Sequence, residues 1–257
     1  MITLGIDAGT RTTKAVLTNS SKVFASVVIL CGQESTAITA DVARRKALSK
    51  AGLSESDVAR TVATGIYGDS VSFADYSLPE GVCLARAMQH LNTSVHSVLD
   101  VGSVRTLAIK CQDGKLTGFA VNDRCASGTG AFVEALAGFF KLPIEELGEV
   151  ALNASEPVDF LNTCAVYVES EALSLLISGN KKVENIIAGA LRGFASRILS
   201  FLIGIGVEMD VAAVGGLARN RALVRAIEEN LGVPLFVPEE PEVTMALGAA
   251  LLAAEKD

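Results

Sequence analysis

One short unit occurs twice in this sequence, and it constrains the fold more than any other feature. The first copy begins at Asp7 with Asp-Ala-Gly-Thr, and the second begins at Asp100 with Asp-Val-Gly-Ser. Each copy follows an apolar, β-branched segment, turns through its glycine and leads into a second apolar segment. Two strand–turn–strand units in matching contexts predict two similar lobes that face each other across a cleft.

Apolar β-branched runs alternate with longer helical patterns along the chain, which predicts an α/β protein with mixed sheets covered by helices. The repeat divides the chain into a first lobe at 1–94, a second lobe at 95–240 and a C-terminal helix at 241–257 that returns to the first lobe. The expected strands are 2–6, 14–18, 23–30, 60–65 and 95–101, and the expected helices are 39–51, 82–90, 131–140 and 242–254, with two more that end near 178 and 231.

The charge and the aromatic content exclude several classes of partner. A net charge of −7 and a pI near 5.0 would repel the phosphates of nucleic acids and of anionic membrane surfaces. Tryptophan is absent and aromatic residues make up only 5%, which leaves little to stack on bases. No stretch approaches about 18 consecutive apolar residues, and the N-terminus shows no basic region or cleavage site. We therefore expect a soluble cytoplasmic protein with no nucleic-acid or membrane partner.

The first Asp-x-Gly turn has the residues of a phosphate-binding hairpin. Its glycine lets the backbone approach an anion closely, and successive N–H groups and threonine hydroxyls could surround phosphate oxygens. Asp7 could hold Mg²⁺ through water, because that ion prefers carboxylates and keeps much of its hydration shell. The turn matches neither a Walker A sequence nor a Gly-x-Gly-x-x-Gly fingerprint. The expected phosphate-binding residues are Gly9, Thr10, Thr12, Thr13 and Lys14.

A third glycine-containing turn lies near the C-terminus. A predicted strand runs into Gly215-Gly216 and then through Asn220 into a helix, which would leave room for an adenine ring against bare backbone. A Gly-Gly pair at a strand end also occurs in ordinary turns, so only its place relative to the other two turns favours an adenine site. We include Gly215, Gly216 and Asn220 in the expected nucleotide site.

The order of the three turns resembles the phosphate-1, phosphate-2 and adenosine segments of the superfamily of acetate kinase, sugar kinases, heat-shock chaperones and actin. The resemblance covers essentially the whole chain and implies two ribonuclease-H-like lobes with ATP between them. It adds Gly102 and Ser103 to the expected nucleotide-binding residues. It also makes Asp7 and Asp100 the expected catalytic carboxylates.

Two of the five cysteines lie where a thiolate would be stabilised. Cys125 precedes the helical pattern at 131–140, and Cys164 precedes the helical pattern that ends near 178. The dipole and the free N–H groups at a helix N-terminus stabilise a negative sulfur. The remaining cysteines, which lie in apolar segments and are expected to be small buried residues, are Cys31, Cys83 and Cys111.

The positions of Cys125 and Cys164 are compatible with three roles. Two thiolates are too few for an iron–sulfur site with four cysteine ligands, but a twofold dimer that contributes both from each subunit could hold one [4Fe–4S] cluster. The same four thiolates could bind zinc. The remaining interpretation is a pair of buried cysteines with no ligand.

The residues around the two thiols resemble those of one family. Asn122-Asp-Arg-Cys-Ala-Ser-Gly-Thr-Gly130 and Thr163-Cys-Ala-Val-Tyr-Val-Glu-Ser-Glu171 are similar to motifs of the activator ATPases of 2-hydroxyacyl-CoA dehydratases, a family that includes ATP-binding subunits of benzoyl-CoA reductases. The resemblance implies a homodimer with one [4Fe–4S] cluster held by Cys125 and Cys164 of each subunit. It further implies MgATP-dependent transfer of a low-potential electron from a ferredoxin or flavodoxin to a partner iron–sulfur enzyme, as part of anaerobic metabolism.

The glycine-containing run after Cys125 would connect the cluster to the nucleotide. The resemblance places this run between a cluster ligand and the phosphates, so that the nucleotide state can reach the cluster. We therefore add Ser127, Gly128, Thr129 and Gly130 to the expected nucleotide-binding residues.

Two segments depart from the family pattern. The family commonly reads Asp-Ile-Gly-Gly-Gln-Asp at phosphate-2, where this chain has Asp100-Val-Gly-Ser-Val-Arg105 and so lacks a Gln and an Asp that could position water. The family's Cys-His-Ala-Arg reads Cys83-Leu-Ala-Arg86 here. These departures favour a divergent branch with a different partner, for which a double-cubane cluster reductase is one candidate.

Two other functions stay open on the sequence alone. A small-molecule kinase of the same fold would use Asp7 and Asp100 for phosphoryl transfer, but it leaves Cys125 and Cys164 unexplained. A non-catalytic nucleotide sensor would use the two thiols to hold a structural zinc ion. Iron and sulfide in the anaerobically purified protein would favour the activator, and zinc in a colourless protein would favour the sensor.

Overall fold

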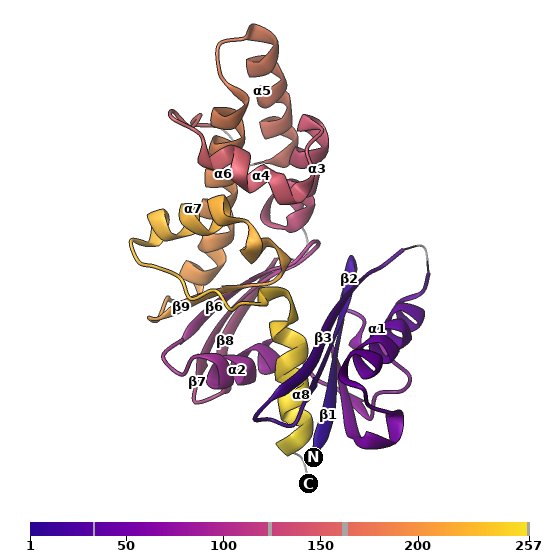
Figure 1. Cartoon of the computed structure of the whole chain (residues 1–257). Coiled ribbons are helices and arrows are strands. Elements are labelled where there is room, and N and C mark those ends of the chain that lie inside the picture. Colours follow the sequence, from indigo (N-terminus) through magenta and orange to yellow (C-terminus); the bar gives the residue numbers. More distant parts are fainter. Residues whose placement is uncertain (33, 123–124, 161–163, 256–257) are drawn as a thin grey trace. The chain divides into compact units, whose positions relative to one another are not determined.

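Two β-sheets with covering helices make up the structure, a computed structural model that describes residues 1–32, 34–122, 125–160 and 164–255 (Figure 1). The contacts within the chain divide it into two compact units. Unit 1 comprises Met1–His96, Ile109–Gly118 and Pro238–Asp257, and unit 2 comprises Ser97–Ala108 and Phe119–Val237. The mixed sheets and their helices confirm the predicted α/β class.

Unit 1 contains a five-stranded sheet of order β3-β2-β1-β4-β5, in which β1 runs antiparallel to β2 and parallel to β4. Its strands are β1 (Ile2–Ala8), β2 (Thr12–Thr18), β3 (Val23–Leu30), β4 (Val58–Thr64) and β5 (Tyr76–Ser77). Its helices are α1 (Thr36–Ala51), α2 (Glu80–Leu91) and α8 (Thr244–Glu255), with short 3₁₀ turns η1 (Glu55–Asp57), η2 (Gly68–Ser70) and η5 (Pro241–Val243).

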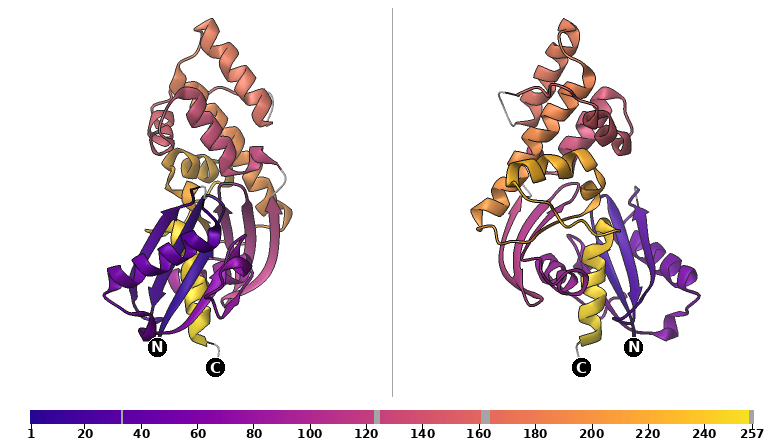
Figure 2. Two further views of the ribbon diagram at one scale, coloured as in Figure 1. Left: turned by 90° about the vertical axis from the view of Figure 1, so that its right-hand side faces the viewer. Right: turned by 60° about the vertical axis from the view of Figure 1, so that its left-hand side comes forward.

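Helices cover both faces of the sheet in unit 1 (Figures 1 and 2). Successive side chains of a strand point to opposite faces, and Leu4 and Ile6 of β1 belong to the core cluster that contains the alanines of α1. Ala246 and Leu251 of α8 instead pack with Val16 of β2. The sheet that begins with the N-terminal strand is therefore completed by the last helix of the chain.

Gly248 allows α8 to lie directly on α2. A Cβ atom at this position would lie 1.8 Å from the carbonyl oxygen of Cys83, so Gly248→Ala must push the two helices apart. We expect Gly248→Ala to lower the free energy of unfolding by about 3 kcal/mol, the upper range of overpacking.

Gly138→Ala is the matched control for Gly248→Ala. Gly138 is also helical, but a Cβ atom there meets nothing within 4 Å. The control should raise the free energy of unfolding by about 0.5–1 kcal/mol, because alanine favours a helix over glycine. Urea unfolding curves measure both changes. Equal stabilities for the two variants would contradict the close packing of α8 on α2.

Unit 2 is built on a four-stranded sheet of order β8-β7-β6-β9, in which β6 runs parallel to β9. Its strands are β6 (Ser97–Val101), β7 (Thr106–Gln112), β8 (Lys115–Asn122) and β9 (Val211–Val214). Its helices are α3 (Gly130–Phe140), α4 (Ile144–Leu152), α5 (Ala165–Ser178), α6 (Val183–Gly204) and α7 (Arg221–Leu231), with 3₁₀ turns η3 (Ala126–Gly128) and η4 (Gly216–Arg219).

The division between the units passes through β7 and β8. Residues 109–118 group with unit 1, although the repeat predicts that all of 95–240 belongs to the second lobe. The physical reason lies at Gly81 of α2, where an added Cβ atom would be 3.1 Å from the side chain of Leu116 and 3.5 Å from that of Ile109. The ends of these two strands therefore pack against α2.

α6 is the central helix of unit 2. Its buried Ile187, Leu191 and Ile198 belong to a core cluster with residues of α3, α4 and α7. Within the described residues, α6 is the one helix that is long and apolar enough to cross a membrane, but 61% of its most apolar window is buried inside the protein. Such burial is typical of the core helix of a globular domain.

Candidate functional site

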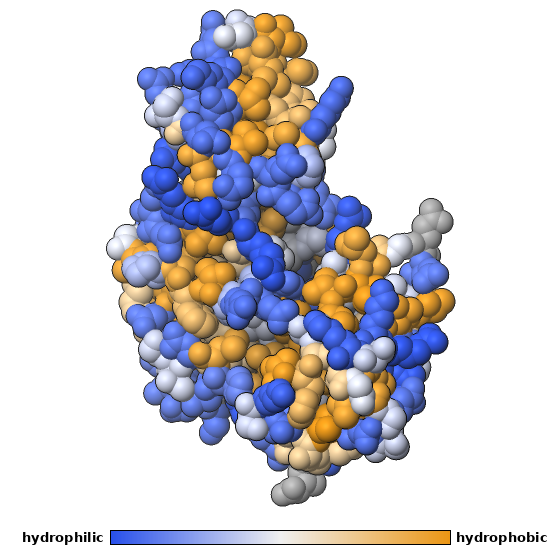
Figure 3. All heavy atoms as spheres, viewed as in Figure 1, coloured by the Kyte–Doolittle hydropathy of each residue, from blue (hydrophilic) through white to orange (hydrophobic). Residues whose placement is uncertain are grey.

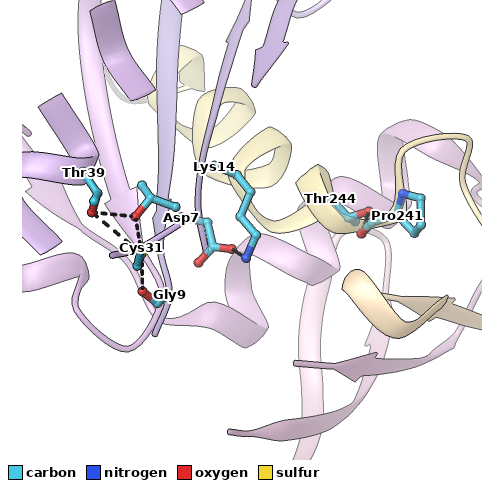
Figure 4. A network of polar contacts seen from close by, with 8 residues as sticks. Asp7, Gly9, Lys14, Cys31, Thr39, Pro241 and Thr244 are labelled. Atoms are coloured by element: carbon cyan, nitrogen blue, oxygen red, sulfur yellow. Dashed lines mark hydrogen bonds and ion pairs between the residues drawn. The ribbon is translucent and has the colours of Figure 1, made fainter. Parts of the chain in front are cut away.

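The first Asp-x-Gly turn joins β1 to β2 and brings a carboxylate beside a cation (Figure 4). Asp7 pairs with Lys14 in the strand register, and Lys14 Nζ lies 2.9 Å from Asp7 Oδ2. The side chains are only 15% (Lys14) and 8% (Asp7) exposed. Gly9 makes the tight turn possible, because a Cβ atom there would lie 2.7 Å from the carbonyl oxygen of Thr12. The expected magnesium-holding carboxylate thus lies at the end of β1 with its charge partly balanced by Lys14.

A small network of polar contacts joins this turn to Cys31 and to Thr39 of α1, as Figure 4 shows for Gly9, Cys31 and Thr39. Thr13 is buried, and its hydroxyl lies 3.2 Å from the hydroxyl of Thr39 in α1 and 3.5 Å from the sulfur of Cys31. Cys31 Sγ also donates to the carbonyl oxygen of Gly9 at 3.7 Å. Thr13 therefore holds the turn to α1. Cys31, expected to be a buried packing residue, is half-buried and bonded to the turn.

The second Asp-x-Gly turn joins β6 to β7 with the same local geometry. Gly102 N–H donates to the carbonyl oxygen of Arg105 at 2.9 Å, and a Cβ atom on Gly102 would lie 2.9 Å from that oxygen. Leu107 occupies the position in this copy that Lys14 occupies in the first. The two turns share a backbone, but only the first copy carries a lysine at this position beside its aspartate.

A glycine with positive φ lies against each aspartate. Gly65 follows β4 with φ +89°, and Gly215 follows β9 with φ +84°. A Cβ atom on Gly65 would lie 2.4 Å from Asp7 Oδ1, and one on Gly215 would lie 2.4 Å from Asp100 Oδ1. The agreement of the two distances shows that the repeat extends to the neighbouring parallel strand. The sequence predicts Gly215 in an adenine site, and it predicts no role in the site for Gly65, although Ala63-Thr-Gly65 is one of the segments that resemble the activator ATPases. The sequence feature that could have identified Gly65 is its place directly after β4, the strand that runs parallel to the Asp7-bearing strand β1.

The expected adenosine turn forms η4 and the start of α7. Gly216 begins η4, and a Cβ atom there would meet nothing within 4 Å, so the backbone is open at this residue. The side chain of Asn220 bonds within the protein. Its Oδ1 accepts the N–H of Leu223 at 3.0 Å as the N-cap of α7, and Gly148 of α4 lies close against it. Asn220 therefore positions the helix that follows the turn.

Cys125 is the N-cap residue of η3, and the side chain of Asn122 bonds both its N–H and its carbonyl oxygen. Asn122 Nδ2 donates to the carbonyl oxygen of Cys125 at 2.9 Å, and Cys125 N–H donates to Asn122 Oδ1 at 3.3 Å. Its half-buried thiol lies 3.9 Å from Nη2 of Arg197 in α6. Neither Asn122 nor Arg197 was singled out from the sequence, although Asn122 begins the motif that contains Cys125.

The run after Cys125 is hydrogen-bonded to the second Asp-x-Gly turn. Gly130 N–H donates to the carbonyl oxygen of Gly102 at 2.8 Å, and Ala131 N–H donates to that of Ser103 at 2.6 Å. The N–H groups of Gly128 and Thr129 donate to the carbonyl oxygens of Cys125 and Ala126. The side chain of Ser127 lies outside the described part of the chain. The thiol segment is thus connected to a predicted phosphate turn through backbone hydrogen bonds at the start of α3.

Cys164 is the exposed N-cap residue of α5. Exposed Val166 and Tyr167 follow it in the first turn of the helix, and Figure 3 shows apolar side chains gathered over one side of α5. Residues 161–163 lie outside the described residues. Ahead of them, Asn185 of α6 fixes the chain, because its Oδ1 accepts the N–H groups of Ser155 and Glu156 at 3.1 Å each.

The described residues contain no group of three or more His, Cys, Asp or Glu side chains that could hold a metal within one chain. Each chain offers two cysteines, Cys125 and Cys164, at the starts of helical elements. A shared site that takes two ligands from each of two subunits would need no third ligand from the same chain.

Known proteins are similar to this chain over almost its whole length. A model of the BadF/BadG/BcrA/BcrD ATPase family matches residues 4–253. The 2-hydroxyisocaproyl-CoA dehydratase activator of Clostridioides difficile is 35% identical over 100% of this chain and 96% of its own length. The (R)-2-hydroxyglutaryl-CoA dehydratase activating ATPase of Acidaminococcus fermentans is 33% identical over 99% and 97%.

Solved structures agree with the sequence comparison. The activator of the 2-hydroxyisocaproyl-CoA dehydratase from Clostridium difficile with bound ADPNP superposes with a TM-score of 0.93 at 35% identity, over 99% of this chain and 95% of that one. The ethanolamine utilization protein EutJ from Carboxydothermus hydrogenoformans shares the fold, with a TM-score of 0.61 at 18% identity over 98% and 90%. These findings confirm the predicted superfamily fold and the resemblance to the activator ATPases, and they support ATP binding and hydrolysis. The chain belongs to the BadF/BadG/BcrA/BcrD ATPase family.

Proposed function

We propose that this protein is a homodimeric ATPase that activates a partner iron–sulfur dehydratase or reductase by ATP-driven transfer of a low-potential electron. The observation that carries the proposal is the placement of Cys125 and Cys164, one half-buried and one exposed, at the starts of η3 and α5. Relatives that are at least 33% identical over nearly the whole chain are activators of 2-hydroxyacyl-CoA dehydratases. This proposal also includes a ferredoxin or flavodoxin as donor and a cytoplasmic location.

The residues around the two thiols fit a [4Fe–4S] cluster shared between two subunits. Cys164 is exposed, and the exposed apolar Val166 and Tyr167 beside it would be covered when a second subunit approaches. Cys125 and Cys164 of each subunit would together supply four thiolates. When bound, such a cluster supplies one-electron chemistry, while the protein sets position, hydrogen bonding and solvent access.

The two Asp-x-Gly turns are the proposed phosphate-binding elements. Asp7 would hold Mg²⁺ through water, and Lys14 lies where it can exchange its contact with Asp7 for one with a phosphate oxygen. Gly9 and Gly102 keep side chains away from the turns, so the backbone N–H groups can approach an anion. Asp100 is the proposed second carboxylate of the nucleotide site.

The hydrogen bonds at the start of α3 give the nucleotide a physical route to Cys125. A shift of the second turn on loss of a phosphate would move the carbonyl oxygens of Gly102 and Ser103, to which Gly130 and Ala131 donate. Gly130 packs directly on this turn, since a Cβ atom there would lie 2.9 Å from Ser103 Cα. We therefore propose that η3 and the thiol of its N-cap residue, Cys125, follow the second turn.

The nucleotide dependence of the metal site tests this proposal. We expect the anaerobically purified or reconstituted dimer to contain iron and sulfide, and its reduced form to lose iron to a chelator faster with a non-hydrolysable ATP analogue than with ADP. The electron paramagnetic resonance signal should also differ between the two nucleotides, because a ligand shifts an equilibrium only through differential affinity. A colourless zinc protein would instead support a nucleotide sensor. Identical signals and release rates at confirmed saturation would contradict the coupling.

A further inference from the structure

α6 brings a cation to the thiol of Cys125 from a distant part of the chain. Arg197 Nη2 lies 3.9 Å from Cys125 Sγ, a long hydrogen bond of the kind that sulfur accepts. One helical turn later, Phe201 lies beside Gly128, where an added Cβ atom would be 3.3 Å from the phenylalanine ring. The same face of α6 therefore lies beside Cys125, the N-cap residue of η3, and beside Gly128, the last residue of η3.

The guanidinium of Arg197 has donor capacity left at this site. Its Nε is buried, and within the described residues it has no hydrogen-bond partner. The contact of Nη2 with Cys125 places this guanidinium next to the thiol, so it can donate to an acceptor that binds there. Arginine carries five N–H donors on a planar, permanently charged group. It can therefore donate to several negatively charged acceptor atoms at the same site.

We propose that Arg197 is a positioning residue for the Cys125 ligand, and that its charge and N–H groups raise the reduction potential of the metal group held there. The inference rests on the proposed function, because it assumes that Cys125 ligates a cluster. Hydrogen bonds to ligand sulfurs and nearby positive charge favour the more negative, reduced state of an iron–sulfur site. In a twofold dimer the two copies of Arg197 act on the two copies of Cys125.

The test uses the full-length protein, reconstituted anaerobically with iron and sulfide, as Arg197→Gln and Arg197→Lys variants. The midpoint potential is read from a redox titration followed by electron paramagnetic resonance. For Arg197→Gln we expect the ratio of reduced to oxidised cluster at the wild-type midpoint to fall about tenfold, which corresponds to about 59 mV for a one-electron couple. Arg197→Lys keeps the positive charge but loses the planar set of N–H donors, so its ratio of reduced to oxidised cluster should fall by a smaller factor. Iron release to a chelator should be faster in both variants.

Arg192→Gln is the matched control. Arg192 lies on the same helix, is exposed, and bonds Glu229 of α7 at 3.3 Å, so its loss changes the net charge equally without touching Cys125. We expect its midpoint to equal that of the wild type. Far-ultraviolet circular dichroism establishes folding, and Arg197→Lys keeps the test available if Arg197→Gln does not fold.

The possible failures are distinguishable. A wild type that takes up no iron and sulfide would overturn the proposed function and this inference together. A loaded wild type with an Arg197→Gln variant of unchanged potential and unchanged iron release would overturn only the role of Arg197. An equal shift in Arg192→Gln would also overturn it, because the effect would then be one of net charge rather than of contact with Cys125.

Discussion

Dimers that carry Cys125→Ser or Cys164→Ser will retain no [4Fe–4S] cluster after anaerobic reconstitution. Each substitution would remove two of the four thiolates from the proposed twofold site, and a cubane cannot be held by the two that remain. Cys83 is a poor replacement for a lost ligand, because it is fully buried in α2 and burial raises the pKa of its thiol to about 12. Iron and sulfide analysis, together with visible absorbance, measures the loss.

Cys111→Ser is the matched control for the two ligand variants. Cys111 is buried in β7, where its thiol donates to the carbonyl oxygen of Val95 at 3.6 Å, and a serine hydroxyl can make the same bond. This variant should keep the wild-type content of about four iron atoms per dimer. Four iron atoms per monomer, or a full cluster in either ligand variant, would rule out the shared arrangement.

Asp7→Asn should reduce the rate of Mg²⁺-dependent ATP hydrolysis by about 100-fold or more, the scale of losing one electrostatic contact to the reacting phosphate. An amide cannot balance the charge of a hydrated magnesium ion, and it leaves Lys14 without the carboxylate that lies 2.9 Å away. Affinity for the nucleotide without magnesium should change much less, since Asp7 is expected to contact the metal and not the base. Turnover assays and calorimetry with and without Mg²⁺ measure the two effects.

Asp113→Asn provides the control for this charge change. Asp113 is exposed in the turn between β7 and β8 with φ +51°, a conformation that asparagine adopts readily. Its hydrolysis rate should match that of the wild type. If Asp7→Asn also keeps its turnover and its Mg²⁺-nucleotide affinity, Asp7 has no part in holding the metal.

Local patterns were enough to predict most of the elements that carry the site. The strand expected at 23–30 is β3, Val23–Leu30, and the helix expected at 39–51 begins three residues earlier, after Ser35 at its N-cap. Boundaries of this kind follow from alternation and turn residues, which are properties of neighbouring positions. The paired Asp-x-Gly turns were predicted for the same reason.

The direction of individual side chains could not be predicted in this way. Thr13 and Asn220 lie in predicted nucleotide-binding turns, but the hydroxyl of Thr13 bonds α1 and the amide of Asn220 caps α7. Which face a side chain takes depends on what packs behind the strand, and that partner is distant in the sequence. The contact between Arg197 and Cys125 joins residues 72 positions apart, and no local motif marks Arg197.

The return of α8 to unit 1 has a consequence for the order of events during biosynthesis. Domains usually fold in the order in which they are synthesised. Here the sheet face of β1 and β2 that receives α8 stays uncovered until the last residues of the chain emerge, by which time all of unit 2 has already been made. Unit 2 can therefore reach its native packing first. Until α8 packs on β2, Val16 stays exposed to solvent and to chaperones.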